Sequence, residues 1–214
     1  MKIEICNATK SIKNNLILDN ISCVLESGKR YGIVGRNGSG KTMLLRAICG
    51  FLKLDSGCIC VDGNEVGSGR NEFISNTGAI IGDVVLYDSL SGLDNLRLLA
   101  EIKKEINDEI IIDTLKKVGL YEAMDKKYAK YSMGMKQRLK IAQAIMENNN
   151  ILILDEPFNG LDKQGVASIQ KVIDDYVCDN KLLILTSHHE AEINNLCNVI
   201  IEMDGGKIID EKQI

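Results

Sequence analysis

The sequence predicts an α/β fold with a parallel sheet at its core and a helical subdomain inserted in the middle of the chain. Short, mainly apolar runs at 151–154, 182–186 and 199–203 alternate with stretches of helical spacing. This pattern is typical of parallel strands covered by helices on both faces. Residues 91–146 show helical spacing almost throughout. We therefore expect a single domain over residues 1–214, with the helical subdomain at about 83–146.

The first third of the chain is expected to consist mainly of strands separated by turns. Ile3 and Ile5 alternate with polar residues, and an apolar run at 31–34 leads directly into a glycine-rich stretch. A helix should follow at 43–51, with Gly50 as its weak point. The expected strands here include Ile3 and Ile5 and the runs 16–18, 21–25, 31–34 and 58–61.

The remainder is expected to alternate helices with strands. Ser91 and Asn107 are the expected N-caps of two helices, and Gly119 is an expected C-cap. The expected later elements are strand 151–154, helix 162–177, strand 182–186, helix 189–197, strand 199–203 and a turn at 204–206 that leads back through 207–210.

Composition excludes several classes of protein. The formal net charge is −4, which argues against a protein that binds nucleic acid mainly by charge, so we expect no nucleic-acid partner. The longest uncharged run, 73–82, has ten residues and is too short to cross a bilayer as a helix. The N-terminal residues contain no apolar core of signal-peptide length.

Seven cysteines are spread along the chain, an odd number whose spacing repeats nothing. Cys58 and Cys60 would point to the same face of one strand, but no second pair of Cys or His follows at zinc-finger spacing. Free cysteines are usually small buried hydrophobes. We therefore expect free thiols and a reducing, cytosolic compartment.

Residues 35–42 match the phosphate-binding pattern G-x-x-x-x-G-K-[ST] in full, between an apolar strand and a helical pattern. Glycines let backbone N–H groups approach phosphate oxygens, and the following helix directs the positive end of its dipole at the anion. Lys41 should reach the β- and γ-phosphates, and the Thr42 hydroxyl should coordinate Mg²⁺. The candidate nucleotide-binding residues are Gly35, Arg36, Asn37, Gly38, Ser39, Gly40, Lys41, Thr42 and Met43.

Two carboxylates, Asp155 and Glu156, follow the apolar strand 151–154. Open α/β sheets place ligands at the carboxyl ends of their strands. Asp155 is therefore the second candidate metal ligand, directly or through water. Glu156 is the candidate catalytic residue that orients or deprotonates the attacking water. An Asp-Glu pair after a strand is more often a solvated loop, but the phosphate-binding loop favours the catalytic interpretation.

The segment 131–138, Tyr-Ser-Met-Gly-Met-Lys-Gln-Arg, resembles the LSGGQ signature of ATP-binding cassette (ABC) transporters. Together with the loop and the carboxylates, it makes the whole chain similar to the nucleotide-binding subunit of that family. The resemblance implies a P-loop NTPase fold of the ABC ATPase type, with an antiparallel β region at the N-terminus. It also implies that four signature residues contact ATP bound to a partner subunit: Ser132, Met133, Gly134 and Met135.

Three further segments fit the family. Asp162 ends the segment 159–162, which matches the loop through which the two subunits communicate. His188 ends a strand as the family's switch histidine does, and motif order selects it over His189 as the second catalytic residue. Residues 86–87 and 90–96 resemble the region that docks the membrane subunit.

Two positions depart from the family at its nucleotide site. The aromatic residue that stacks on adenine falls at Ile12, so stacking is weaker, or Tyr31 or another residue substitutes. The glutamine of the metal-and-membrane loop falls at Gly82. Either Asp83 reaches the metal in its place, or coupling depends on the docking segment 84–96; we favour the second.

The resemblance implies an ATPase that binds ATP and Mg²⁺ and powers a separate membrane-spanning subunit. Met133 and Met135 resemble a branch associated with drug and peptide-antibiotic export and self-immunity. The chain would pair with a second copy or a second ABC subunit, and would lie in the cytoplasm against the inner face of the cell membrane. Two alternatives remain: a slow-turnover regulatory ATP-binding module, which Ile12 and Gly82 support, and a soluble ABC protein of translation or DNA repair.

Overall fold

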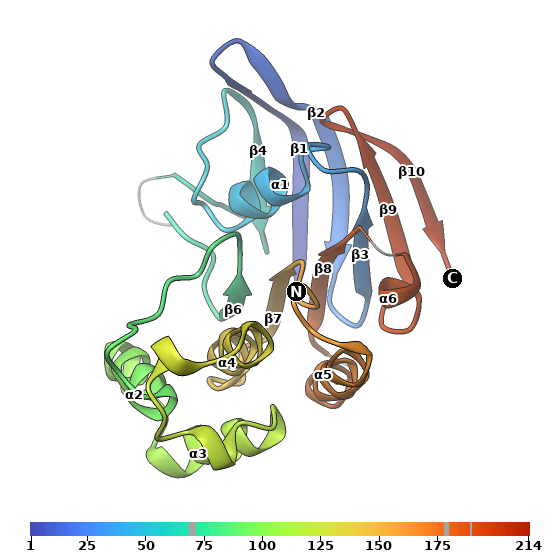
Figure 1. Ribbon diagram of the computed structural model, residues 1–214. Coiled ribbons are helices and arrows are strands. Elements are labelled where there is room, and N and C mark those ends of the chain that lie inside the picture. Colours follow the sequence, from blue (N-terminus) through green and yellow to red (C-terminus); the bar gives the residue numbers. More distant parts are fainter. Residues whose placement is uncertain (69–71, 178–179, 189) are drawn as a thin grey trace.

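The computed structural model describes residues 1–68, 72–177, 180–188 and 190–214. In this part of the chain the strands form two sheets (Figure 1). All neighbours in the larger sheet are parallel except the antiparallel pair β10–β9. Its strand order is β10 (Lys207–Gln213), β9 (Val199–Asp204), β3 (Arg30–Val34), β8 (Leu182–Ser187), β7 (Ile151–Asp155) and β6 (Thr77–Ile80).

The central strands β7 and β8 are buried on both faces, which explains why they appear as unbroken apolar runs. Ile151 and Ile153 pack into the core on one side of the sheet. Leu152 and Leu154, which alternate with them, pack into the core on the other side. The expected parallel sheet is therefore confirmed.

The N-terminal region forms the expected antiparallel sheet, in the order β2 (Asn15–Glu26), β1 (Lys2–Ile12), β4 (Ser56–Val61) and β5 (Asn64–Glu65). A two-residue turn joins β1 to β2, with Lys13 and Asn14 at φ 49° and 66°. The strands β1 and β2 are longer than the sequence predicts. The short strands β5 and β6 were not predicted.

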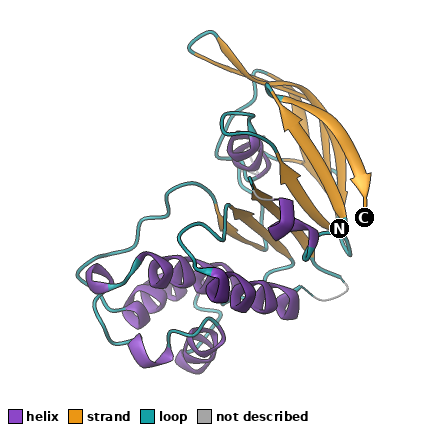
Figure 2. Cartoon of the chain, turned by 45° about the vertical axis from the view of Figure 1, so that its right-hand side comes forward, coloured by secondary structure: helices purple, strands orange, loops and turns teal. Residues whose placement is uncertain are grey.

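The α-helices of the described residues are α1 (Lys41–Ile48), α2 (Gly92–Lys103), α3 (Asp108–Lys117), α4 (Met133–Ile145), α5 (Lys163–Tyr176) and α6 (Glu190–Asn194). Short 3₁₀ turns at Tyr121–Ala123 and Tyr128–Lys130 lie between α3 and α4. Most helices lie together at one end of the molecule, away from the antiparallel strands (Figure 2). No helix in the described ranges is long and apolar enough to span a membrane.

Local signals place most helix ends correctly. Ser91 and Asn107 cap α2 and α3 by accepting hydrogen bonds from Asp94 N and Ile110 N. The expected helix 43–51 instead begins at Lys41 and ends at Ile48, because Gly50 has φ 84° and terminates it. The expected helix 189–197 is shorter, and His189 lies outside the described residues.

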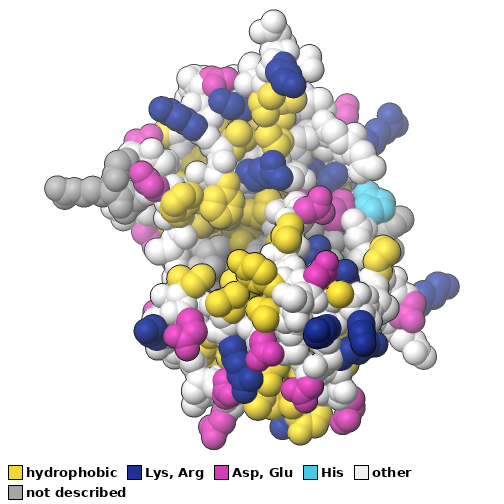
Figure 3. Space-filling view, turned by 60° about the vertical axis from the view of Figure 1, so that its left-hand side comes forward, with side chains coloured by type: hydrophobic (Ala, Val, Ile, Leu, Met, Phe, Trp, Pro, Cys, Tyr) yellow, Lys and Arg dark blue, Asp and Glu magenta, His cyan; other side chains and the backbone are white. Residues whose placement is uncertain are grey.

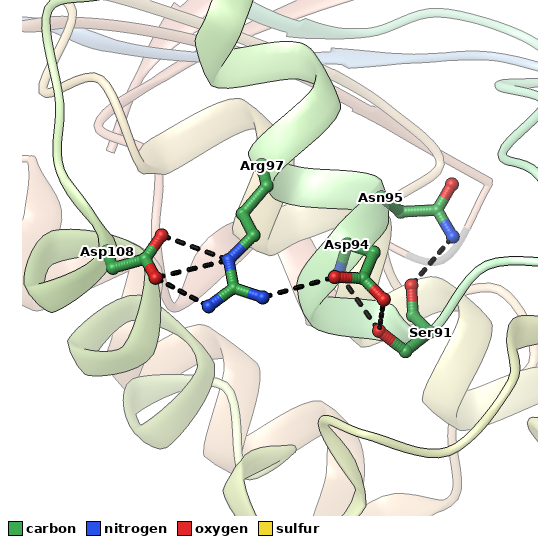
Figure 4. A network of polar contacts seen from close by, with 5 residues as sticks. All are labelled: Ser91, Asp94, Asn95, Arg97 and Asp108. Atoms are coloured by element: carbon green, nitrogen blue, oxygen red, sulfur yellow. Dashed lines mark hydrogen bonds and ion pairs between the residues drawn. The ribbon is translucent and has the colours of Figure 1, made fainter.

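A polar network joins the start of α2 to the start of α3 (Figure 4). Arg97 donates to Asp108 from Nε at 3.0 Å and to Asp94 from Nη1 at 3.1 Å. The hydrogen bonds from Arg97 lower the pKa of Asp108 below its usual value. The Ser91 hydroxyl donates to Asp94 at 2.7 Å, which is the largest cause of the lowered pKa of Asp94. These contacts fix the first turn of α2.

The cysteines do not share one environment. Cys49 and Cys197 are buried, and burial raises the pKa of both thiols to about 12. Cys6 is exposed, and Cys58 is partly exposed. The expectation of buried hydrophobic cysteines is therefore wrong for Cys6. Cys178 lies outside the described residues.

Candidate functional site

The carboxyl ends of β3, β7 and β8 meet at one edge of the larger sheet. Asp155 at the end of β7 lies opposite Thr186 of β8, and Val34 at the end of β3 lies opposite Ser187. The chain continues from β3 into the phosphate-binding loop, and from β7 into Glu156. Parallel pairing therefore brings the separate sequence motifs to the same edge.

The phosphate-binding loop has a backbone that only glycine adopts readily. Gly35, Gly38 and Gly40 have φ values of 151°, 84° and 104°. A Cβ at Gly35 would also lie 2.2 Å from the backbone oxygen of Met203. The glycines therefore allow the loop to turn tightly against the strand β9.

The loop and the first turn of α1 fit an anionic group. Gly40 precedes the helix and provides no side-chain cap, so the first N–H groups of α1 have no side-chain acceptor there. Lys41 is only 6% exposed, and its Nζ donates to the backbone oxygens of Gly35 at 2.7 Å and Arg36 at 3.2 Å. The ammonium group thus lies over the loop, where phosphate oxygens would replace backbone carbonyls as acceptors.

Asp155 is the centre of the polar contacts at this edge. Its Oδ2 accepts from the Thr42 hydroxyl at 2.8 Å and from the backbone N–H of Gly82 at 3.2 Å. Its Oδ1 accepts from the Thr186 hydroxyl at 2.7 Å. Thr42 and Asp155, the two candidate metal ligands, are therefore in direct contact. Such hard oxygen donors suit Mg²⁺.

The two candidate catalytic residues are also adjacent. His188 Nδ1 lies 2.8 Å from Glu156 Oε2. Glu156 has φ 49°, an uncommon backbone conformation for a residue other than glycine, and its N–H donates to Thr186 Oγ1 at 3.0 Å. His188 and the loop residues Gly35 and Arg36 line one open cleft of about 640 Å³.

Thr186 is a functional residue that the sequence interpretation missed. Its fully buried hydroxyl donates to Asp155 and accepts from the Glu156 N–H, so one side chain positions both carboxylate residues. The available signal was a hydroxyl residue near the carboxyl end of the apolar strand β8, directly opposite Asp155.

Thr186→Val should destabilise the protein by about 1–3 kcal/mol, because it leaves buried polar groups without their partner. ATP hydrolysis should also slow, since Asp155 and Glu156 lose a shared support. Urea unfolding and steady-state ATPase assays measure the two effects. Thr186→Ser, which keeps the hydroxyl, is the control. A valine variant as stable and as active as the serine variant would contradict this role.

The backbone of Gly82, rather than a side chain, contacts the metal-site carboxylate. Gly82 has φ 63°, and a Cβ at this position would lie 2.9 Å from Arg46 Nη2. A glutamine here would therefore be strained. Among the described residues, no hydrogen bond or ion pair joins Asp83 to Asp155 or Thr42. The backbone of Gly82 is therefore the part of this loop that contacts Asp155.

Tyr31 cannot replace the missing adenine-stacking ring. It is 1% exposed and lies in the core beneath the N-terminal sheet, where its hydroxyl accepts from Glu26 N at 3.0 Å. Ile12 ends β1 at the turn into β2 and is 37% exposed. Of these two side chains, only the aliphatic Ile12 is open to a ligand.

The signature segment begins α4. Ser132 is the N-cap and accepts from Met135 N at 3.3 Å. Met133 is 73% exposed, and its Cε lies 2.9 Å from where a Cβ of Gly160 would be. Gly134 also faces Gly160, because a Cβ added at Gly134 would lie 3.4 Å from the backbone oxygen of Gly160. The signature therefore packs beside the segment that leads to Asp162.

Asp162 and Gln137 connect this region to the catalytic edge. Asp162 caps α5 by accepting from Gly165 N at 2.7 Å. Gln137 Nε2, on α4, donates to the oxygen of Pro157 at 2.9 Å, directly after Glu156. Within the described residues, no hydrogen bond joins the signature to the phosphate-binding loop. The signature, at the start of α4, lies in the lower half of Figure 1, and the loop, before α1, lies in the upper half.

The fold and this edge define a nucleotide-hydrolysing ATPase of the P-loop class. Residues 18–159 match the family model described as "ABC transporter". The uncharacterized ABC transporter ATP-binding protein YybJ of Bacillus subtilis (strain 168) is 41% identical, over 99% of this chain and 97% of that protein. The lantibiotic transport ATP-binding protein SrtF of Streptococcus pyogenes is 33% identical, over 99% of this chain and 90% of that protein.

The solved dimeric structure of MJ0796, a bacterial ABC transporter cassette, has the same fold. Its TM-score is 0.88 at 22% identity, with 99% of this chain and 98% of that chain covered. The chain belongs to the ABC transporter family as an ATP-binding subunit, and it is an ATPase.

Proposed function

We propose that this ATPase powers the export of a peptide antibiotic through a separate membrane-spanning subunit, from the cytoplasmic side of the cell membrane. The observation that carries the proposal is the similarity to a lantibiotic transport subunit along nearly the full length of both chains. The methionines of the signature, Met133 and Met135, also support this branch.

The site supports hydrolysis by roles that we assign as follows. Lys41 and the uncapped first turn of α1 hold the phosphates. Thr42 and Asp155 would hold Mg²⁺, which would neutralise charge on the phosphate oxygens. Glu156 orients and deprotonates the attacking water, and His188 holds the Glu156 carboxylate in place. The backbone N–H of Gly82 completes the contacts of Asp155.

These contacts favour an enzyme that hydrolyses ATP in repeated cycles over a regulatory module with slow turnover. The regulatory alternative rests on Ile12 and Gly82, yet at Gly82 the loop still contacts Asp155 through its backbone N–H. No feature of the described residues favours a role in translation or DNA repair over transport.

Two cassettes would be needed to enclose ATP. Ser132 and the phosphate-binding loop lie in different halves of the molecule and share no bond within the described ranges. A head-to-tail pair would bring the signature of one subunit to the loop of the other, under a two-fold axis for two copies of this chain. The N-terminus of α4, exposed at Met133, would then face the γ-phosphate.

The segment before α2 fits the docking of a membrane partner. Tyr87 is 61% exposed and Val85 is 87% exposed. Asn95, buried in α2, accepts from Tyr87 N at 2.8 Å and donates to Tyr87 O at 3.1 Å. A buried amide thus fixes the backbone at an exposed aromatic side chain. Leu86, by contrast, is 7% exposed and packs in the core, so Tyr87 supplies the exposed side chain of this pair.

The face that carries the connection from β6 to α2 is hollowed. Figure 3 shows hydrophobic side chains on both sides of this hollow. Exposed hydrophobic patches of this kind mark interaction sites on soluble subunits. Phe51 and Phe73, exposed and 5.5 Å apart between ring centroids, form a further apolar contact on the surface of the molecule.

Tyr87→Ala should leave ATP hydrolysis by the isolated subunit within a few-fold of the parent. Hydrolysis should lose its stimulation by the membrane subunit, because the exposed aromatic side chain would supply the contact with that subunit. The assay is ATP hydrolysis by the co-purified complex in proteoliposomes. Tyr121→Ala, which removes an exposed tyrosine beside α3, is the matched control. Equal stimulation in the Tyr87 and Tyr121 variants would contradict docking at this segment.

The proposed function is tested by deleting the gene and measuring sensitivity to peptide antibiotics. Increased sensitivity, restored by the parent chain but not by Lys41→Ala, is the expected result. Unchanged sensitivity to lantibiotics and related peptides would reject peptide export and leave the ATPase activity standing. A membrane protein encoded beside this chain would identify the partner to co-express.

A further inference from the structure

Three cysteines from two strands lie together on the outer face of the N-terminal sheet. Cys6 of β1 pairs directly with Cys58 of β4, and Cys60 lies two residues further along β4. The neighbouring pair Ile5 and Ile59 points to the opposite face and is buried in the core. Because side chains alternate along a strand, all three thiols share the face that is turned away from the core.

The backbones approach closely at the paired thiols. Cys6 is the last paired residue before a register shift in β1, and Asn7 has φ 49°. A Cβ at Gly57 would lie 2.4 Å from the oxygen of Cys6 and 2.3 Å from that of Asn7. Glycine at 57 therefore lets the two strands come together directly beside the Cys6–Cys58 pair.

The pairing geometry suits a bridge between Cys6 and Cys58. Residues directly opposite in an antiparallel pair have Cβ atoms about 4.5–5.5 Å apart, close to the roughly 3.5–4.5 Å that a disulfide spans. Cys58 and Cys60 are two residues apart in one strand, so their Cα atoms are roughly 6.6 Å apart and their side chains point in parallel. That spacing is at the limit for a disulfide.

Exposure separates this cluster from the buried thiols, and the thiol of Cys23, which is partly exposed, has a pKa that burial raises to about 12. Cys6 is exposed, and both Cys58 and Cys60 are partly exposed. Cys49 and Cys197 are buried, and their thiol pKa values of about 12 leave almost no reactive thiolate at neutral pH. Cys6 is therefore the most accessible of the described thiols to an oxidant in solution.

We propose that Cys6 and Cys58 form a reversible oxidation site that closes to a disulfide between β1 and β4. The oxidant is a low-molecular-weight disulfide. The Cys6 thiolate attacks one of its sulfur atoms, forms a mixed disulfide and releases one thiolate. The Cys58 thiolate then attacks the Cys6 sulfur, forms the Cys6–Cys58 bond and releases the second. Two protein thiols are oxidised, two small thiols are produced, and the two protons pass to the released thiolates.

The test uses the full chain with Cys178→Ser, which removes the cysteine outside the described residues. The folded protein is incubated with oxidised glutathione, blocked with iodoacetamide, and mapped by mass spectrometry after digestion. We expect a Cys6–Cys58 cross-link, two fewer alkylatable thiols, and full reversal by dithiothreitol. The link should persist in Cys60→Ser and be lost in both Cys6→Ser and Cys58→Ser.

A thermal melt supplies a second readout and a check of folding. The oxidised chain should melt at a higher temperature than the reduced chain, because a link across the sheet restricts the unfolded state. This shift should be absent in Cys6→Ser, whose exposed position tolerates serine. Failure of the folded chain to form the link would overturn the proposal, as would a main product that joins Cys58 to Cys60 or involves Cys49.

Discussion

Glu156→Gln is expected to bind ATP as the parent chain does and to hydrolyse it about 10²–10⁴-fold more slowly, the usual cost of losing a general base. Glutamine preserves the shape of the side chain and can still contact His188, which lies 2.8 Å from Glu156 Oε2. The backbone bond from position 156 to Thr186 does not depend on the side chain. The substitution therefore removes the charge that activates water and little else.

Steady-state hydrolysis and nucleotide titration separate these two effects. Sedimentation of the variant with ATP adds a third readout, because blocked hydrolysis should leave ATP between two subunits and accumulate the dimer. Glu192→Gln is a matched control, since Glu192 accepts a hydrogen bond from the hydroxyl of Ser187, the last residue of β8. A Glu156→Gln chain that hydrolyses ATP at the parent rate would remove this residue from the chemistry.

Lys41→Ala is expected to weaken ATP binding about 10- to 100-fold. A charge-assisted hydrogen bond contributes about 1.5–3 kcal/mol, and the ammonium group should exchange the oxygens of Gly35 and Arg36 for phosphate oxygens. Because these contacts also hold the loop together, thermal melting must show that the variant is folded.

Isothermal titration with ATP and with adenosine distinguishes the phosphate contribution from the base contribution. Affinity for adenosine should be unchanged, because the lost cation faces the phosphates. Lys117→Ala, which removes an equal charge from an exposed position on α3, is the control. If Lys41→Ala and Glu156→Gln weakened binding equally, the separation of binding from chemistry between these residues would be wrong.

Much of the site could be predicted because its motifs are local. The phosphate-binding loop needs glycines at particular positions, and its chemistry follows from residues adjacent in the chain. The strands β7 and β8 were recognised because burial on both faces demands continuous apolar residues. Ser91 and Asn107 could be predicted as caps for a similar reason, since a cap and the residue whose N–H donates to it are only three positions apart.

The strand β6 was not predicted because its close packing against α4 requires a glycine within the strand. A Cβ at Gly78 would lie 1.8 Å from the backbone oxygen of Ala144 in α4, so only glycine fits there. Glycine weakens a strand pattern, and four residues offer little periodicity to compensate. The close approach of α4 is a tertiary contact that the local sequence does not show.

The amino-acid sequence was sufficient for the class of fold, the nucleotide loop and the two carboxylates, because each depends on a short segment of chain. Contacts between distant segments required the folded structure. Gly82 reaches Asp155, Thr186 supports Glu156, Tyr31 is buried away from the nucleotide, and Cys6 meets Cys58. The physical reason is that strand order and register, which bring these segments together, arise from packing of the whole core rather than from any local pattern.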